Sequence, residues 1–323
     1  MEKFELNILG CGSALPTTKH FLSSQVINLR DKLFMIDCGE GTQIQFRRLQ
    51  LKFSRLNHIF ISHLHGDHCF GLPGLLSTLN LLGRTATIYI HAQPEAQKIF
   101  QPLLDYFCRD MSYDIVFRPF DPYKHEMIFE DRTLKVYTIP LKHRVPTAGF
   151  LFEEKAKSPH IIREMIDFYK VPVSRINLIK TGADFVTPEG EIVPNCRLTR
   201  PAAPPKRYAY CSDTAYSEAI IPIIKGVDVL YHEATFSGED LARAKETYHS
   251  SAEQAAEIAQ KAQVKQLILG HFSARYPNEN RLLEEAKAIF PNTILAHEGM
   301  KKEIGKEEQG EGIRRREKRK GND

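Results

Sequence analysis

The stretch NHIFISHLHGDH, residues 57–68, decides the fold of this chain. Its first half, residues 57–62, is short and apolar, which predicts a buried β-strand. Four candidate metal ligands follow at once, and they are His63, His65, Asp67 and His68. Neutral imidazole and carboxylate are usual ligands of Zn²⁺. In a turn after a strand, the alternate side chains of His63 and His65 can point to one ion, while Asp67 and His68 point to a second. The stretch therefore predicts a metal site.

One loop supplies too few ligands for a pair of metal ions, and further candidates follow later apolar segments. His143 comes shortly after residues 136–139, Asp213 follows residues 208–211, and His271 follows residues 267–269. In α/β proteins, sites gather at the carboxyl ends of strands. A single histidine in such a place is more often structural, but four strands with the same arrangement support one another.

Short apolar segments and amphipathic segments share the rest of the chain, and this pattern predicts an α/β protein. The alternating residues Phe4, Leu6 and Ile8 indicate a first strand, which ends in a glycine turn at residues 10–13. We expect two sheets packed face to face and covered by helices. Other strands are expected at 25–29, 33–36, 87–91, 115–118, 134–139, 207–211, 227–231, 266–269 and 293–296, and helices at 41–49, 95–107, 217–224, 253–262 and 280–289.

Four motifs outside the histidine stretch resemble those of one family. They are LGCGSALP at 9–16, IDCGEGTQ at 36–43, HEAT at 232–235 and GHFSARY at 270–276. Together they resemble ribonuclease Z, the tRNA 3′-endonuclease of the metallo-β-lactamase superfamily, from about residue 4 to residue 299. The histidine stretch itself is common to the superfamily, including lactamases and glyoxalase-type thioesterases. It therefore indicates metal chemistry without indicating a substrate.

The resemblance implies the metallo-β-lactamase fold, an α/β structure in which an αββα sandwich binds two Zn²⁺ ions per chain. Asp213 would bridge the two ions. The first ion would be held by His63, His65 and His143, and the second by Asp67, His68 and His271. Two metals roughly 3.5–4 Å apart can stabilise both the attacking and the departing oxygen of a phosphodiester.

The implied reaction is removal of the 3′ trailer from precursor tRNA by a zinc-dependent endoribonuclease. A hydroxide bridging the metals and oriented by Asp67 would attack, leaving a 3′-hydroxyl on the tRNA and a 5′-phosphate on the trailer. His249 would protonate the departing oxygen, with Glu233 as its carboxylate partner. The Ser-x-x-Glu pattern from Ser250 to Glu253 predicts a capping box and a helix start. A plain structural role at that helix start is the alternative for His249.

The resemblance also suggests substrate contacts. Ser273 and Arg275 would touch the RNA backbone, although an arginine there can instead stabilise its loop by pairing with a carboxylate. An insertion at about residues 153–205 breaks the strand rhythm and matches the position of the family's substrate arm, which grips the tRNA body. Its basic and acidic residues nearly cancel. The gripping role is therefore inferred from position, and a solvated structural excursion is the alternative.

The resemblance implies a hydrolase domain at residues 1–300, which includes the inserted arm. Composition predicts a charged, disordered tail at residues 301–323. The tail has nine Lys and Arg against six Asp and Glu, so it carries most of the net charge of +4. No apolar run of about 18 residues and no signal-peptide core occur, so we expect no membrane association and a cytoplasmic protein. Six scattered cysteines indicate reduced thiols, and the family is commonly a homodimer.

Three functions are compatible with these observations. The first is the endonuclease acting on precursor tRNA. The second is a hydrolase of the same fold for another substrate, such as a small phosphodiester, a sulfate ester or a thioester. The third is a catalytically silent protein that binds RNA or metal. The inserted arm and His249 favour the first over the second, and the complete ligand set argues against the third.

Overall fold

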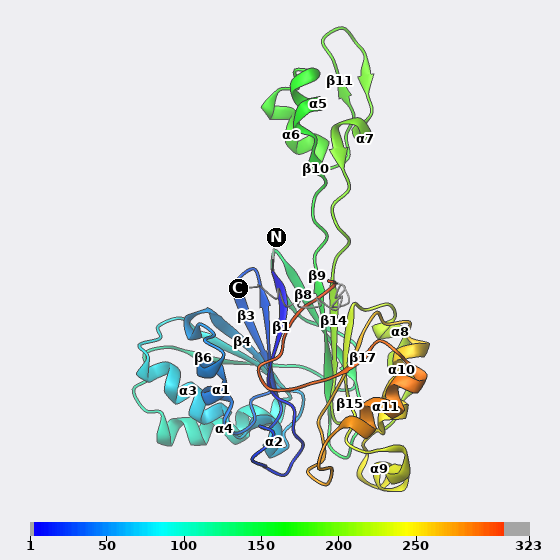
Figure 1. Ribbon diagram of the computed structural model, residues 1–323. Coiled ribbons are helices and arrows are strands. Elements are labelled where there is room, and N and C mark those ends of the chain that lie inside the picture. The colour runs from blue at the N-terminus through cyan, green and yellow to red at the C-terminus, as the bar shows by residue number, and fades with distance from the viewer. Residues whose placement is uncertain (1–2, 307–323) are drawn as a thin grey trace, which may run out of the picture.

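The computed structural model describes residues 3–306, and two seven-stranded sheets pack face to face within them (Figure 1). The first sheet has the order β18-β1-β2-β3-β4-β5-β6, antiparallel from β18 to β3 and parallel from β3 to β6. Its strands are β18 (Lys301–Glu303), β1 (Phe4–Gly10), β2 (Ser24–Leu29), β3 (Lys32–Ile36), β4 (Leu56–Phe60), β5 (Ile88–Ala92) and β6 (Ile115–Pro119).

The second sheet has the order β17-β16-β15-β14-β9-β8-β7. It repeats the plan of the first sheet, since it is parallel from β17 to β14 and antiparallel from β14 to β7. Its strands are β17 (Thr293–Leu295), β16 (Leu267–Gly270), β15 (Val229–Glu233), β14 (Arg207–Cys211), β9 (Ala148–Glu154), β8 (Leu134–Pro140) and β7 (Met127–Glu130).

Helices cover the outer faces of both sheets and complete the predicted αββα sandwich (Figure 1). The first sheet is accompanied by α1 (Thr42–Arg48), α2 (Gly66–Cys69), α3 (Leu72–Leu81) and α4 (Pro94–Phe107). The second is accompanied by α8 (Ile221–Ile224), α9 (Leu241–Thr247), α10 (Ala252–Lys261) and α11 (Asn280–Ile289). None of the helices in residues 3–306 combines the length and apolarity that a membrane crossing requires.

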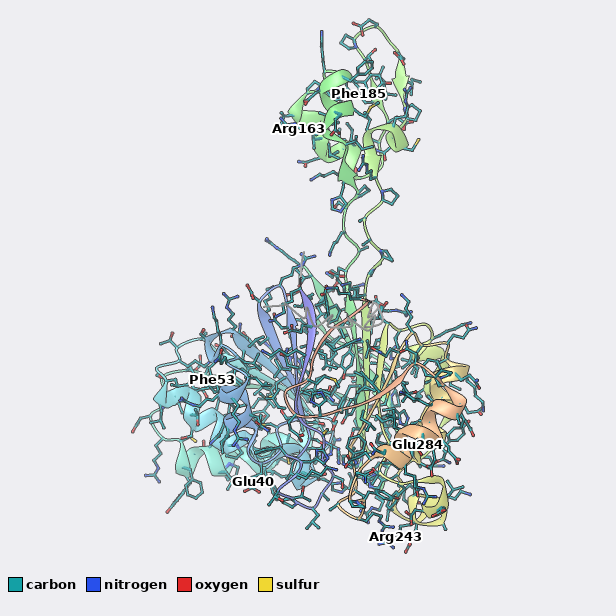
Figure 2. The ribbon with its side chains drawn as sticks, in the orientation of Figure 1. Glu40, Phe53, Arg163, Phe185, Arg243 and Glu284 are labelled. Atoms are coloured by element: carbon teal, nitrogen blue, oxygen red, sulfur yellow. The ribbon has the colours of Figure 1, made fainter. Side chains whose placement is uncertain are left out.

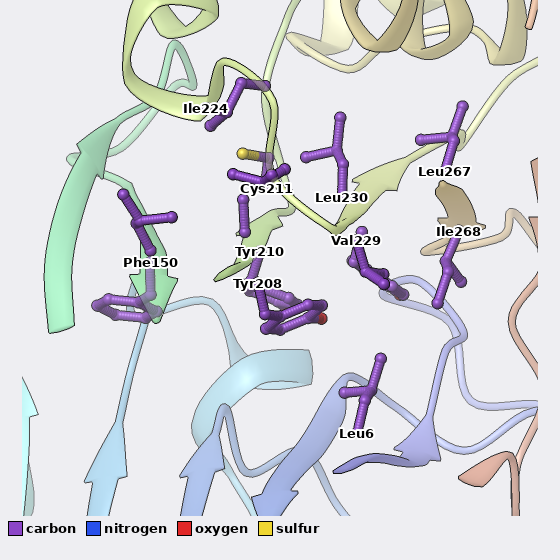
Figure 3. Packing of buried hydrophobic residues seen from close by; sticks show 14 of the residues in the cluster. Leu6, Phe150, Tyr208, Tyr210, Cys211, Ile224, Val229, Leu230, Leu267 and Ile268 are labelled. Atoms are coloured by element: carbon purple, nitrogen blue, oxygen red, sulfur yellow. The ribbon is translucent and has the colours of Figure 1, made fainter. Parts of the chain in front are cut away.

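The central strands, such as β2 and β15, are buried on both faces because each sheet is covered on both sides. Along β3, Phe34 points into the core between the sheets, while Leu33 and Met35 join the core under the helices of the first layer. Between the sheets, the ring of Phe60 lies 5.6 Å from that of Phe150. Figure 3 shows this central core, to which β14 and its neighbours contribute Tyr208 and other large side chains.

Residues 155–206 leave the body between β9 and β14 and end in a small head, and we call this segment the arm (Figure 1). The apolar core of the head is separate from the cores of the body and consists of Ile166, Val171, Ile179, Phe185, Val193 and Leu198. The elements of the head are β10 (His160–Ile161), α5 (Arg163–Phe168), α6 (Val173–Lys180), β11 (Phe185–Val186), β12 (Ile192–Val193), α7 (Asn195–Leu198) and β13 (Thr199–Arg200).

Two sequence predictions need correction. The disordered tail was predicted to begin at residue 301, but Lys301–Glu303 forms β18 on the edge of the first sheet, and the side chain of Ile304 is buried. Residues 307–323 lie outside the described part of the chain. The helix predicted at residues 217–224 is a 3₁₀ turn, Glu218–Ile220, followed by the four-residue α8, because Pro222 lacks the N–H that a longer helix needs.

The finding at β18 predicts that two truncations differ in stability. A chain ending after Met300 loses β18 and the buried Ile304, whose side chain alone stabilises the fold by about 2 kcal/mol. A chain ending after Lys306 keeps both. We expect the shorter chain to melt roughly 5 °C below the longer one in calorimetry. Equal melting temperatures would mean that β18 adds nothing to the stability of the sheet.

Candidate metal centre and active site

The seven predicted metal ligands come together at one end of the sandwich, where the strands that precede them end. His63 and His65 follow β4, and Asp67 and His68 lie on the short helix α2. The remaining three, His143, Asp213 and His271, follow β8, β14 and β16. Residues more than 200 positions apart are therefore neighbours, and their nitrogen and oxygen atoms form two groups with Asp213 in both.

The first group joins His63, His65 and His143 to Asp213. The Nε2 atom of His63 lies 3.0 Å from Nδ1 of His65 and 3.6 Å from Oδ2 of Asp213. The Nε2 atom of His143 lies 3.8 Å from the same carboxylate oxygen. Three ring nitrogens and one oxygen therefore point to a common place, as the ligands of a tetrahedral ion do.

The second group joins Asp67, His68 and His271 to the other oxygen of Asp213. Both His68 and His271 place Nε2 3.1 Å from Oδ1 of Asp213 and 3.4 Å from Oδ2 of Asp67. The two carboxylate oxygens of Asp213 thus face one group each, which is the arrangement of a bridging ligand.

Two observations show that these residues suit metal ions. Within residues 3–306, the buried Nε2 atoms of His68 and His143 have no hydrogen-bond partner. Buried polar atoms are rarely left in that state, and a cation would satisfy the lone pairs of both nitrogens. The five imidazoles and two carboxylates also supply nitrogen and oxygen atoms, which are ordinary ligands of zinc.

The outer nitrogens of the histidines are held by hydrogen-bond partners that fix each ring. The Nδ1 atom of His68 lies 2.7 Å from the buried carboxylate of Asp37, which also accepts from the hydroxyl of Tyr210. The Nδ1 atom of His271 lies 2.9 Å from the hydroxyl of Thr235. Such contacts orient the ring and leave Nε2 for an ion.

Buried charges fix the protonation of the ligands. Burial, together with the neighbouring His68, lowers the pKa of His63 well below its ordinary value, so that ring is neutral. Burial alone would raise the pKa of Asp213, but the neighbouring imidazoles of His271 and His68 hold it well below its usual range. Neutral histidine and ionised aspartate are the forms that bind metal.

The site stores backbone strain at three of its residues. Asp37, Asp213 and His271 have φ values of 55°, 55° and 59°, in the left-handed region that residues other than glycine seldom adopt. Each costs about 1–3 kcal/mol unless the surroundings compensate. The sharp turns that result bring the three side chains back over the ends of the strands.

The predicted pair of His249 and Glu233 lies beside the second ligand group. The Nδ1 atom of His249 lies 2.9 Å from Oε1 of Glu233, a fully buried carboxylate that also accepts from the backbone N–H of Ser250 and the hydroxyl of Thr235. Burial opposes a charge on His249, but Glu233 outweighs it and raises the pKa to about 9.

The capping box lies one residue beyond its predicted place. Ser251, not Ser250, caps α10, and it exchanges hydrogen bonds with Gln254, not with Glu253. The hydroxyl of Ser250 instead donates to the carbonyl of Thr214, 2.6 Å away. The segment after His249 is thereby fastened to the loop that carries Asp213.

A cavity of about 200 Å³ opens onto both ligand groups and His249. Ser273 and Arg275, the predicted substrate contacts, line it together with two arginines that the sequence analysis did not select, Arg144 and Arg243. Arg275 also forms an ion pair of 2.9 Å with Asp240. Its position is therefore compatible with both predicted roles, contact with the RNA backbone and stabilisation of its own loop. The position of Arg144 directly after His143 was the signal that could have identified it.

Comparison with known proteins decides the family. A ribonuclease Z of Parabacteroides distasonis is 65% identical over 301 residues, which are 93% of this chain and 99% of that protein. A ribonuclease Z of Bacteroides thetaiotaomicron is 64% identical over 300 residues, 93% of this chain and 95% of that protein. The chain belongs to the ribonuclease Z family.

Broader comparisons agree with the fold of this ribonuclease Z family member. Residues 197–272 match a family model described as a beta-lactamase superfamily domain, and residues 4–156 match one described as the anti-Pycsar protein Apyc1. The crystal structure of the short form of human tRNase Z superposes with a TM-score of 0.68 at 24% identity, over 93% of this chain and 99% of that one. The predicted metallo-β-lactamase fold is thereby confirmed.

Two ribonuclease Z motifs contain supporting residues that the sequence analysis quoted without a role. Asp37 belongs to the motif at 36–43 and orients His68. Thr235 closes the motif at 232–235 and contacts both Glu233 and His271. Their roles depend on contacts between distant strands, which spacing in the sequence does not reveal.

The buried pair predicts a pH dependence that can be measured on metal-free protein. Because the pKa of His249 is raised from 6.5 to about 9, its charge stabilises the fold fully below pH 6.5, and this stabilisation is lost as pH rises through about 9. In Glu233→Gln the charge and the hydrogen bond of Glu233 are lost, and burial remains the largest influence, so the pKa of His249 should fall well below 9. NMR titration of the ring measures it, with Glu253→Gln as a control, and a value still near 9 would contradict the assigned pairing.

Proposed function

We propose that this protein cuts precursor tRNA at the 3′ end, leaving a 3′-hydroxyl on the tRNA and a 5′-phosphate on the released trailer. The observation that carries the proposal is a complete hydrolytic site in a chain that is 65% identical to a curated ribonuclease Z. Two ligand groups share Asp213, and they border one cavity with His249 and three arginines. The relatives come from bacteria, and bacteria make their tRNA in the cytoplasm. We therefore propose that this protein is cytoplasmic.

We infer that the two ligand groups hold two Zn²⁺ ions. His63, His65 and His143 would hold one, Asp67, His68 and His271 the other, and Asp213 would contribute one oxygen to each. When bound, such ions supply Lewis acidity toward phosphate oxygens and make water more acidic. The ligand residues fix the position of this chemistry at the floor of the cavity.

His249 has the geometry of the proton donor to the departing oxygen. Its side chain is 12% exposed and borders the cavity, and its ring stacks on that of His271 with centroids 5.4 Å apart. Glu233 accepts from Nδ1, so the ring is oriented and its charge is balanced. As the bond from phosphorus to the 3′-oxygen breaks, His249 would give its proton to that oxygen.

The arginines of the cavity match the charge of an RNA backbone. A guanidinium presents a flat set of donors that fits phosphate oxygens. Arg243 and Arg275 are already oriented by ion pairs with Glu246 and Asp240. Arg144 makes no ion pair among residues 3–306, so its full charge is available to a substrate phosphate. Phosphates on either side of the cut would therefore be drawn into the cavity.

The hydrolase of a small substrate remains the second candidate, because the metal groups would serve it equally well. The arm separates the two candidates, since a small substrate has no use for it. At the root of the arm a cavity of about 710 Å³ is lined by six basic residues, and they are Arg30, Arg132, Lys155, Lys157, His160 and Lys180. Arg30, Lys155 and Lys157 pair there with Glu154 or Glu130, so part of this positive charge is balanced and the rest can meet phosphates.

The arm points away from the site of its own chain. Arg163 and Phe185 in the head lie at one end of the molecule, while Arg243, which lines the catalytic cavity, lies at the other (Figure 2). The cause is the direction of β14, which begins at the arm with Arg207 and ends at the site with Cys211. An arm that grips the tRNA cut in this cavity would therefore belong to a second copy of the chain.

Exposed apolar side chains support a homodimer. They gather at the adjacent helices α3 and α4 of the first layer, and they are Leu81, Leu82, Ile99, Leu103, Tyr106 and Phe107. Phe107 is 71% exposed, which is costly for a large apolar ring in water. We propose that this face packs against its counterpart in a second copy, so that the arm of each copy serves the other.

The metal ligands predict the effect of Asp67→Ala. Removing this carboxylate should lower cleavage of precursor tRNA by at least about a hundredfold, roughly 2.7 kcal/mol of transition-state stabilisation. Cleavage of a 5′-labelled precursor measures the rate and also maps the cut, and circular dichroism checks the fold. Asp114→Ala, at an exposed position, is the control. A folded Asp67→Ala protein within about tenfold of the wild-type rate would refute the role of Asp67, and a cut away from the 3′ end would refute the proposed function.

Excision of the arm separates the tRNA enzyme from the small-substrate hydrolase. Since Glu154 and Lys206 are hydrogen-bonded neighbours, an Asn-Gly turn can replace residues 155–205. We expect at least a tenfold loss of tRNA cleavage, about 1.4 kcal/mol of binding, with little change toward a small chromogenic phosphodiester. Mixing this variant with Asp67→Ala should restore cleavage, because the mixed dimer joins an intact site to the arm of its partner. Equal loss on both substrates would contradict the gripping role, and no restoration would contradict an arm acting between chains.

A further inference from the structure

A third group of ligand atoms lies apart from the two that share Asp213. The thiol of Cys11, at the end of β1, meets the ring of His20 from the following loop and the carboxylate of Glu298 from the segment before β18. The sulfur lies 3.5 Å from Nδ1 of His20 and 3.6 Å from Oε1 of Glu298. The same Nδ1 lies 3.3 and 3.1 Å from the two oxygens of Glu298.

These separations match those between the ligands of a tetrahedral zinc ion. With Zn–S near 2.3 Å and Zn–N and Zn–O near 2.0 Å, sulfur lies about 3.5 Å from its fellow ligands, and nitrogen lies about 3.3 Å from oxygen. With Oε1 as the oxygen of Glu298, the three distances in this group agree with those values to within about 0.1 Å. Cysteine, histidine and a carboxylate are all ordinary zinc ligands.

The surrounding contacts also have the form of a metal site. The Nε2 atom of His20 lies 3.2 Å from Glu279, whose carboxylate is held by Lys19 at 2.5 Å. A carboxylate on the far nitrogen of a ligand histidine is the common support of zinc sites. The backbone N–H of Phe21 donates to Glu298 at 2.9 Å and fixes that ligand as well.

We propose that Cys11, His20 and Glu298 form a third metal site, which takes a thiophilic divalent cation such as Zn²⁺. The charges balance, because a thiolate and the carboxylate of Glu298 neutralise the ion, while Lys19 neutralises Glu279. Burial and the nearby Glu298 raise the pKa of the Cys11 thiol. Binding of the cation therefore releases the thiol proton to solvent as the sulfur–metal bond forms.

The site would fasten the wall of the catalytic cavity. Gly12 pairs with Phe272 directly after the ligand His271, and Ser13 lines the cavity. A cation would tie this turn to Glu298, which is far away in the sequence. A separate cavity of about 190 Å³ borders the site on one side, where His20 and Glu279 line it.

Cobalt provides a test that does not depend on cleavage of RNA. Metal-free full-length protein is titrated with Co²⁺, and the near-ultraviolet charge-transfer band of a thiolate–cobalt bond is recorded. Among the candidate metal groups of residues 3–306, the third is the one that contains sulfur, so the band reports on that site. We expect the band and about three cobalt ions per wild-type chain, against no band and about two ions in Cys11→Ser.

Two further variants keep the test decisive. Cys69→Ser alters the thiol nearest to the histidine stretch, where the sulfur donates to the carbonyl of His65, and it should keep the band. If Cys11→Ser does not fold, Glu298→Gln should bind the third ion at least about tenfold more weakly. A wild-type chain with no band, or a band undiminished in folded Cys11→Ser, would overturn the proposal and leave His20 as an imidazolium between two carboxylates.

Discussion

The arrangement of the two ligand groups depends on the carboxylate of Asp213, which belongs to both. One of its oxygens faces His63 and His143, and the other faces His68 and His271. These histidines come from both sheets, so a single buried side chain closes the seam between the two halves of the sandwich. The buried carboxylates of Asp67 and Asp213 are tolerated because bound metal ions would balance their negative charge.

The same constraint explains the strain around the site. The strands can bring their ends together, but a regular strand end would point the side chains outward. Left-handed residues at Asp37, Asp213 and His271 turn them back over the seam. Hydrogen bonds then hold the rings, as Asp37 does for His68 and Thr235 for His271. The cost in backbone energy is offset by the large core beneath, which runs through both sheets.

The fold also separates the ligand groups from the arm. β14 has the arm at its start and Asp213 just beyond its end, so the two lie at opposite ends of one strand. If the arm grips tRNA as we propose, a second copy of the chain is needed to combine the arm and the cavity on one tRNA. The exposed apolar side chains of α3 and α4 are consistent with that need. Under that proposal, selection of the substrate would be a property of the assembly, while hydrolysis would be a property of each chain.

The sequence by itself predicted the fold class and the seven candidate ligands, because motif spacing and apolar alternation are local signals. The resemblance to ribonuclease Z added the pair of His249 and Glu233. The sequence analysis missed β9 and α3, since a strand buried on both faces shows no alternation, and Pro73 and Gly74 obscure the helix. Only the tertiary structure decided the roles of Asp37, Thr235 and Arg144, the direction of the arm, and the meeting of Cys11 with Glu298. Each of these depends on which distant strands become neighbours, and that is fixed by the packing of the whole chain and not by any short stretch of it.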